Sequence, residues 1–137
     1  YSVDLSLDAE EKMRDLCSRG KSNAFLFFDY GLSWETLIRE RPFGTARAYF
    51  QHQVSSDLLI RKGHQDLTCS VCWTRIERIF EDHGFSVEWM PQSSFFLKYA
   101  KEAILELGKD PLAAGTLREL LSPSHMGRSF QSFFARA

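Results

Sequence analysis

The residues best suited to chemistry lie between His64 and His83, where two cysteines follow the spacing Cys-x-x-Cys. Together Cys69, Cys72, His64 and His83 supply the four side chains that a structural zinc site requires. A zinc-binding Cys-x-x-Cys normally lies on a turn and is matched by a second compact pair of ligands, whereas these histidines stand singly. The spacing is therefore weak evidence for zinc.

A helix over residues 67–83 explains the same cysteines without a metal. In such a helix Cys69 and Cys72 share one face with Ile76 and Ile79, because all are three or four residues apart. A redox pair would instead need a strand directly before the cysteines, so that a helix N-terminus could lower the thiol pKa. The sequence predicts no strand there. We therefore expect buried, reduced thiols, no metal and no cofactor.

One carboxylate, Asp29, stands at the end of a predicted strand, where enzymes often have a catalytic residue. Asp29 closes an apolar run and precedes Tyr30 and Gly31, and ligands of open α/β sheets bind at the carboxyl ends of strands. No histidine or second carboxylate stands at a diagnostic spacing, and the sequence contains no GxGxxG, GxxxxGK or HExxH motif. Asp29 is thus a weak candidate for a catalytic residue, and a backbone-capping role is the alternative.

Basic residues form a second candidate site. Three arginines surround Phe43 and two further cations end a predicted helix, namely Arg39, Arg41, Arg47, Arg61 and Lys62. With an exposed aromatic ring they could bind phosphate or nucleic acid. The net charge of −1 and the pI near 6.5 lack the basic excess of most nucleic-acid-binding domains. Nucleic acid is therefore a possible but less favoured partner.

Three strands and six to seven helices are predicted to position these residues. The strands cover residues 1–7, 24–30 and 85–90. The first and third alternate apolar and polar residues, whereas 24–30 is apolar without alternation and should be covered on both faces. The sequence therefore predicts a helix-rich α/β or α+β fold, whose small three-stranded sheet has 24–30 as its central and most buried strand, joined to 1–7 by a parallel βαβ unit.

The predicted helices follow the apolar periodicity and the capping residues. They cover residues 8–19, 33–39, 45–62, 67–83, 94–107, 111–122 and 129–137. The last presents Phe130, Phe133 and Phe134 on one face. These rings would either pack on their own domain or anchor a partner.

Composition limits the class of protein. A chain of 137 residues with 44% hydrophobic and 26% charged content suits one globular domain, residues 1–137. Because it begins at Tyr1 rather than Met, we expect a domain excised from a larger protein. Three cysteines are too few for a disulfide framework, which favours an intracellular location, cytoplasmic or nuclear. The apolar runs are too short to span a membrane.

The absence of a catalytic motif favours a non-catalytic interaction domain. A protein–protein interaction or assembly domain of a larger protein would bind another protein or a second copy of itself through aromatic residues, which make up 14% of the chain. The alternatives are a module that binds nucleic acid or phosphate through the basic residues, and an α/β enzyme that uses Asp29.

Overall fold

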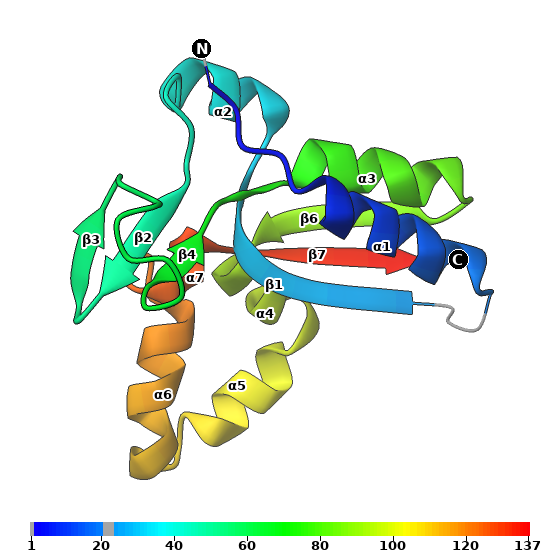
Figure 1. Ribbon diagram of the computed structural model, residues 1–137. Helices are drawn as coiled ribbons and strands as arrows, with labels where there is room; N and C mark the ends of the chain where they lie inside the picture. Colours follow the sequence, from blue (N-terminus) through cyan, green and yellow to red (C-terminus); the bar gives the residue numbers. More distant parts are fainter. Residues whose placement is uncertain (1, 21–23) are drawn as a thin grey trace.

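The computed structural model describes residues 2–20 and 24–137 (Figure 1). The helices are α1 (Leu7–Ser18), α2 (Trp34–Glu40), α3 (Trp73–Asp82), α4 (Gln92–Tyr99), α5 (Lys101–Leu107), α6 (Pro111–Leu121) and α7 (Met126–Ser129). The strands are β1 (Ala24–Leu32), β2 (Arg47–Phe50), β3 (Gln53–Ser55), β4 (Asp66–Thr68), β5 (Val71–Cys72), β6 (Ser86–Pro91) and β7 (Phe130–Arg136). No helix of the described residues is long and apolar enough to cross a membrane.

The main sheet has four strands in the order β5-β1-β7-β6. β7 is antiparallel to both neighbours: Phe133 lies opposite Phe27 of β1 and Trp89 of β6. β1 and β6 therefore run in the same direction with β7 between them. β5 pairs in parallel with β1 through two residues, Gly31 and Leu32.

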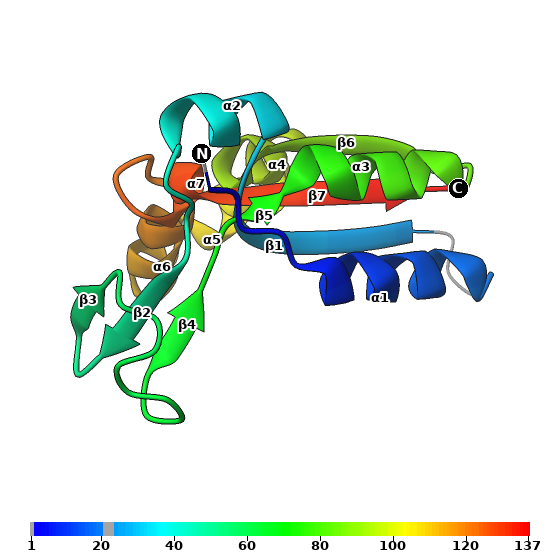
Figure 2. The same ribbon diagram turned by 45° about the horizontal axis from the view of Figure 1, so that its top comes forward.

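Helices cover both faces of this sheet. α1 and α3 lie on one face and α4 on the other (Figures 1 and 2). The ring of Phe25 packs 5.2 Å from that of Phe80 in α3, and the ring of Phe28 packs 5.6 Å from that of Phe95 in α4. Because both faces are covered, the β1 sequence shows no alternation.

The core lies between β7 and α3. The side chains of Phe80 and Phe133 are fully buried, and Trp73 stacks on Phe133 with ring centroids 5.2 Å apart. Burying one such ring contributes about 1.5 to 3 kcal/mol. Ser132 and Ala135 of β7 are also fully buried, so β7 and not β1 is the most buried strand.

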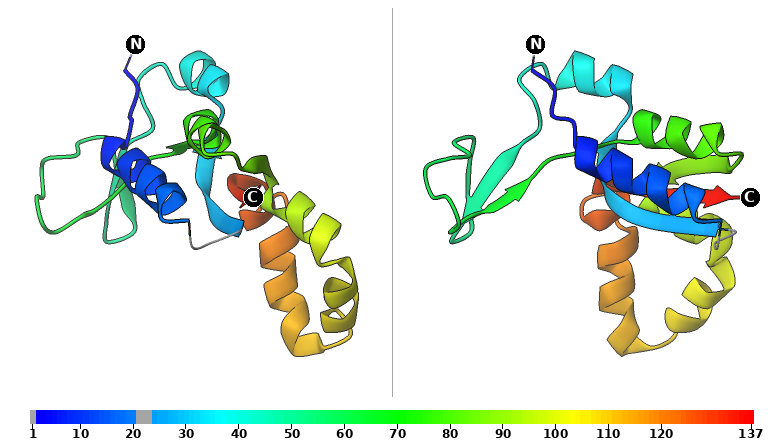
Figure 3. Two further views of the ribbon diagram at one scale, coloured as in Figure 1. Left: turned by 90° about the vertical axis from the view of Figure 1, so that its right-hand side faces the viewer. Right: turned by 45° about the vertical axis from the view of Figure 1, so that its right-hand side comes forward.

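A second, three-stranded sheet in the order β3-β2-β4 stands apart from the main sheet (Figure 1). Gln51 and His52 join β2 to β3 with φ angles of 47° and 64°. Two consecutive positive φ values are typical of a type I′ hairpin turn. On another side of the molecule, α5 and α6 form a projecting helical hairpin (Figure 3).

The predicted three-stranded sheet is wrong. The strands over 24–30 and 85–90 exist, but β7 separates them, and both β7 and β5 are strands of this sheet that the sequence did not predict. Residues 3–6 form no strand, and Ser2 makes only an isolated bridge to Phe43; Tyr1 lies outside the described residues. The alternation over 1–7 fails because no strand of the described chain lies beside it, so the βαβ unit is also wrong.

Three predicted helices are also wrong in whole or in part. Residues 45–62 contain the β2–β3 hairpin, 66–72 contain β4 and β5, and 130–136 form β7. Each of these segments pairs with a strand that is distant in sequence or across a turn that no Gly or Pro marks. Helical spacing of apolar residues within a short window cannot reveal such partners.

Candidate functional site

A cleft of about 600 Å³ lies at the carboxyl end of β1. Four parts of the chain line it: Tyr30, Gly31 and Leu32 at the end of β1; residues 41 and 43–47 of the following loop and β2; Ser56 and Ser70; and Arg128, Ser129 and Gln131 around the start of β7. Strand ends of open α/β sheets are the usual place for ligands. The fold therefore supplies one cleft in the position that the chemistry of such sheets favours.

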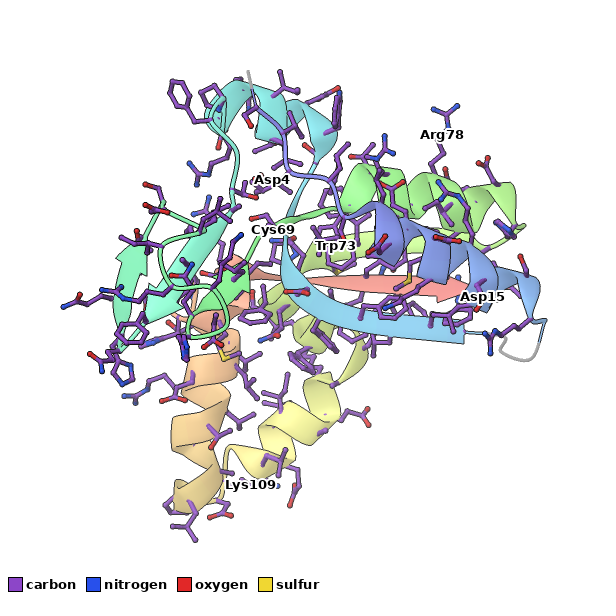
Figure 4. All side chains as sticks on the ribbon, viewed as in Figure 1. Asp4, Asp15, Cys69, Trp73, Arg78 and Lys109 are labelled. Atoms are coloured by element: carbon purple, nitrogen blue, oxygen red, sulfur yellow. The ribbon has the colours of Figure 1, made fainter. Side chains whose placement is uncertain are left out.

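Asp4 holds the loop wall of this cleft in place. Its carboxylate Oδ2 accepts hydrogen bonds from the backbone N–H groups of Thr45 and Ala46, and from the Thr45 hydroxyl at 3.2 Å. The Thr45 Oγ1 in turn accepts a hydrogen bond of 2.9 Å from the N–H of Ser70. Thr45 therefore ties together the N-terminal segment, the loop before β2 and the loop after β4, in the region where Figure 4 labels Asp4 and Cys69.

A glycine allows the close approach of Asp4. Gly44 has a φ of 88°, and a Cβ at this position would lie 2.7 Å from Asp4 Oδ2. Both the positive φ and the contact exclude a side chain. The carboxylate can therefore reach the backbone of the loop directly.

The charge of the cleft is positive. Arg41, Arg47 and Arg128 line it, and its lining contains no Asp or Glu. Two aromatic rings accompany them: Phe43 is 93% exposed and Tyr30 is 42% exposed. Guanidinium groups beside exposed aromatic rings can bind an anionic group on a flat or apolar body.

The structure brings together only part of the predicted basic site. Arg41, Phe43 and Arg47 share the cleft. Arg39 instead pairs with Glu40 at 3.0 Å, and the guanidinium of Arg61 lies 4.3 Å from the centre of the Phe50 ring. Neither these two residues nor Lys62 lines the cleft.

Arg128 is a basic residue of the cleft that the sequence did not predict as part of a binding site. It lies in α7, directly before β7, and reaches the cleft because β7 pairs along β1. No local pattern marks it, because its position depends on the pairing of two strands far apart in the sequence.

Asp29 lies beside the cleft rather than in its lining. The side chain is exposed, and its Oδ1 accepts a hydrogen bond of 2.7 Å from the N–H of Tyr30. The backbone-capping alternative is therefore present. A catalytic role for Asp29 stays a prediction.

The two cysteines do not share a helix face. Cys69 is exposed in the loop after β4, whereas Cys72 is 7% exposed and immediately precedes α3. The prediction that both lie in one helix is therefore wrong: Cys72 lies in β5 and Cys69 in the loop before it. The predicted burial is wrong for Cys69 and confirmed for Cys72. Although a short strand does precede α3, burial raises the pKa of the Cys72 thiol, which disfavours the thiolate that redox chemistry needs.

The described residues hold no group of three or more His, Cys, Asp and Glu side chains placed for a metal ion. His83 Nδ1 lies 2.7 Å from the carbonyl oxygen of Ile79 in its own helix. His64 lies on an exposed loop. The four candidate zinc ligands thus come from separate local environments.

The C-terminal phenylalanines lie in β7 and pack within the described fold. Phe133 faces α3, and Phe134 packs against the rings of Phe95 and Tyr99 on the opposite face. The Phe130 ring lies 4.1 Å from that of Tyr30. Strand geometry separates Phe133 from Phe134, which the predicted helix placed together.

A family model described as "Putative S-adenosyl-L-methionine-dependent methyltransferase" matches residues 1–90. The chain belongs to this methyltransferase family. The expectation of a non-catalytic interaction, assembly or scaffold domain is therefore wrong, and the enzyme alternative fits the family better. The sequence did not favour an enzyme because it contains no GxGxxG, GxxxxGK or HExxH motif.

Solved structures share the fold of this chain. Two crystal structures of proteins from Burkholderia thailandensis match this chain, one described as "uncharacterized" and the other as a "likely methyl transferase". Their TM-scores are 0.85 and 0.84, each at 24% identity over 98% of this chain. The second contains bound S-adenosyl-homocysteine. The chain spans only 38% and 37% of the lengths of these two proteins. No curated protein matches the chain.

Proposed function

We propose that this chain forms the acceptor-binding side of an S-adenosyl-L-methionine-dependent methyltransferase. The observation that carries the proposal is the cleft at the carboxyl end of β1, walled by the loop that Asp4 holds. The family match and the bound S-adenosyl-homocysteine in one structural relative support methyl transfer as the reaction.

The cleft does not fit S-adenosyl-L-methionine as a whole. That molecule carries a sulfonium and an ammonium group but only one carboxylate, so its net charge is positive, whereas Arg41, Arg47 and Arg128 line the cleft without an Asp or Glu. Its carboxylate could pair with one arginine, but its two cationic groups would then lie among guanidinium groups with no acidic residue in the lining to balance them. The described residues also contain no glycine-rich turn between a strand and a helix that would admit a nucleoside close to the backbone. We therefore assign this cleft to the methyl acceptor.

The free edge of β1 is consistent with a cofactor site formed by a further part of the protein that pairs with this edge. Opposite β7, β1 pairs with β5 only at Gly31 and Leu32, and no other described strand covers the edge of residues 24–30. Unpaired strand edges accept a further strand readily. The structural relatives contain far more chain than is matched here, which is enough to extend a sheet at this edge.

The chain's own residues can then bind and orient an acceptor. The arginines would bind its anionic group, and Tyr30 and Phe43 would cover its apolar part. Asp29, which precedes Tyr30 near the end of β1, is the candidate proton acceptor. Holding two reactants in a fixed orientation is itself a large part of catalysis.

The test uses the full product of the gene that encodes this chain. Binding of S-adenosyl-homocysteine is measured by calorimetry, and transfer of tritium from methyl-labelled S-adenosyl-L-methionine is measured with a cell extract as the source of acceptor. We expect Arg47→Ala and Asp29→Asn to lower label transfer at least about tenfold while the affinity for S-adenosyl-homocysteine changes less than about twofold. Arg39→Ala, an exposed arginine outside the cleft, is the matched control.

Two results would contradict the proposal. One is the absence of any S-adenosyl-homocysteine binding by the full gene product. The other is a parallel loss of cofactor affinity and label transfer in the Arg47 variant, which would place the cofactor rather than the acceptor in the cleft.

A further inference from the structure

Three separate elements bring unpaired arginines to one cleft. Arg41 follows α2, Arg47 begins β2 and Arg128 lies in α7. Among the described residues none of the three forms an ion pair, whereas four other arginines each pair with a carboxylate, namely Arg14, Arg19, Arg39 and Arg75. Like charges that share a cleft without a counter-charge repel one another. A bound anion would remove that repulsion.

Four carboxylates adjoin this lining, either in sequence or through a hydrogen bond, and none of them pairs with its arginines. Asp57 accepts hydrogen bonds from the backbone N–H groups of Leu59 and Ile60. Asp4 accepts hydrogen bonds from Thr45 and Ala46. Glu40 is paired with Arg39 at 3.0 Å, and Asp29 accepts a hydrogen bond from the Tyr30 backbone. Each has a partner outside the arginine group. The Arg41 guanidinium donates one hydrogen bond of 3.3 Å to the backbone carbonyl of Glu40, and among the described residues no carboxylate forms an ion pair with any of the three guanidinium groups.

The shape of the cleft suits a small anionic molecule or the end of a side chain. Its volume of about 600 Å³ falls in the range of ordinary ligand sites. The Phe43 ring, 93% exposed, lies in the same lining and can cover an apolar or flat body. Guanidinium groups bind carboxylate and phosphate through two parallel hydrogen bonds, which fixes orientation as well as charge.

We propose that Arg41, Arg47 and Arg128 form an oxyanion-binding subsite that holds a carboxylate or phosphate group of the methyl acceptor. That the bound molecule is the acceptor rests on the function proposed above; that the cleft binds an oxyanion does not. The methyl group would be received elsewhere on the same molecule, and the anionic group would act as the handle that sets its position.

Calorimetric titration of the full gene product with inorganic phosphate, and separately with citrate, tests the subsite without any cofactor. We expect saturable binding of one of the two, which also identifies the preferred oxyanion. Arg47→Ala and Arg128→Ala should each weaken it about tenfold or more, since a hydrogen bond to a charged group is lost. Arg39→Ala should leave the affinity within about twofold of the wild type, because this arginine lies outside the cleft.

A lysine substitution separates guanidinium recognition from a diffuse positive field. Arg47→Lys keeps the charge but loses the two-pronged donor, and we expect it to weaken binding several-fold. Binding equal to the wild type in this variant would overturn the proposal, as would equal losses in the Arg39 and Arg47 variants. Unchanged melting temperatures would show that each variant is folded.

The two proposals fail in different ways. Absence of phosphate and citrate binding, with S-adenosyl-homocysteine still bound, would overturn the subsite and leave the methyltransferase function standing. Oxyanion binding without any cofactor binding would support the subsite and overturn the function. If the bound oxyanion does not inhibit label transfer, its role as the acceptor handle is overturned.

Discussion

Trp73 lies directly over the backbone of Gly31, so closely that a Cβ on Gly31 would be 2.0 Å from the indole Nε1. Gly31 lies in the part of β1 that lines the cleft, and Trp73 begins α3. The indole is also stacked on Phe133, so it cannot move away without disturbing the core. The contact joins the floor of the cleft to the most buried part of the protein.

We therefore expect Gly31→Ala to destabilise the fold by about 3 kcal/mol or more, because overpacking displaces a fixed ring. Gly115→Ala is the matched control: apart from its chain neighbours and the nearby backbone of α6, no atom lies within 4 Å of its Cβ position. That change should raise stability by roughly 0.5 to 1 kcal/mol, since alanine favours a helix. Urea unfolding of both variants measures the difference, and equal stabilities would refute the contact.

Glu10 joins α1 to α3 through a buried carboxylate. It is 5% exposed, and its two oxygens accept hydrogen bonds of 2.6 and 2.8 Å from Arg75. The hydrogen bonds from Arg75 hold the pKa of Glu10 below its ordinary value, although burial opposes this shift. A lowered pKa in the folded state stabilises the fold above the unfolded-state pKa, and that stabilisation is lost as pH falls through the folded value.

Glu10→Gln should thus lower stability at pH 7 by about 1 to 3 kcal/mol and flatten its dependence on pH in the acid range. Glu11→Gln, at an exposed neighbouring position, should change neither quantity appreciably. Urea unfolding between pH 3 and pH 7, the range that brackets an ordinary carboxyl pKa of about 4.3, is the measurement. An acid dependence in Glu10→Gln as steep as in the wild type would contradict the role of this ion pair.

The three cysteines should differ in reactivity. Cys69 is exposed, whereas Cys17 and Cys72 are each 7% exposed. Partial desolvation raises the pKa of Cys69, and the carboxylates of Asp4 and Asp29 raise it further. Because the thiolate is the reactive form, its reaction with a disulfide reagent should keep accelerating above the pH at which an ordinary thiol levels off.

Under native conditions we expect one thiol to react fast and the other two only after unfolding. Cys69→Ser should remove the fast phase, and Asp29→Asn should shift its pH dependence to lower pH. A fast phase that survives in Cys69→Ser would show that a buried thiol is accessible.

Phe133 should be the most sensitive phenylalanine of β7. It is fully buried against α3, so Phe133→Ala should lower stability by about 3 to 5 kcal/mol. Phe43→Ala, at a ring that is 93% exposed, should change it by less than about 0.5 kcal/mol. Thermal unfolding followed by circular dichroism compares the two. Similar melting temperatures for both variants would contradict the placement of β7.

Local signals predicted the elements that depend on nearby residues. The helix predicted over 33–39 is α2, and it is capped by Ser33, whose hydroxyl accepts a hydrogen bond from the N–H of Thr36. Asp110 caps α6 in the same way through Leu112. The run over 24–30 is a strand because both of its faces meet helices.

Signals that depend on distant partners were missed. Gln51 and His52 adopt positive φ angles without the Asn or Gly that normally marks such a turn. Phe130 to Arg136 form a strand because β1 and β6 lie on either side, not because of their own sequence. The cleft could not be predicted for the same reason, because Arg128 lies beside Arg41 and Arg47 only when β7 is paired in the sheet.

The position of β7 also sets the order of events during synthesis. β1 and β6 have no direct pairing, and the strand that joins them follows both in the sequence. At the usual rates of translation, β1 waits on the order of ten seconds before β7 emerges. During that time its phenylalanines lack their strand partner, a state prone to intermolecular pairing. A nascent chain stalled before residue 130 should therefore bind chaperones more strongly than one stalled after β7 has emerged from the ribosome.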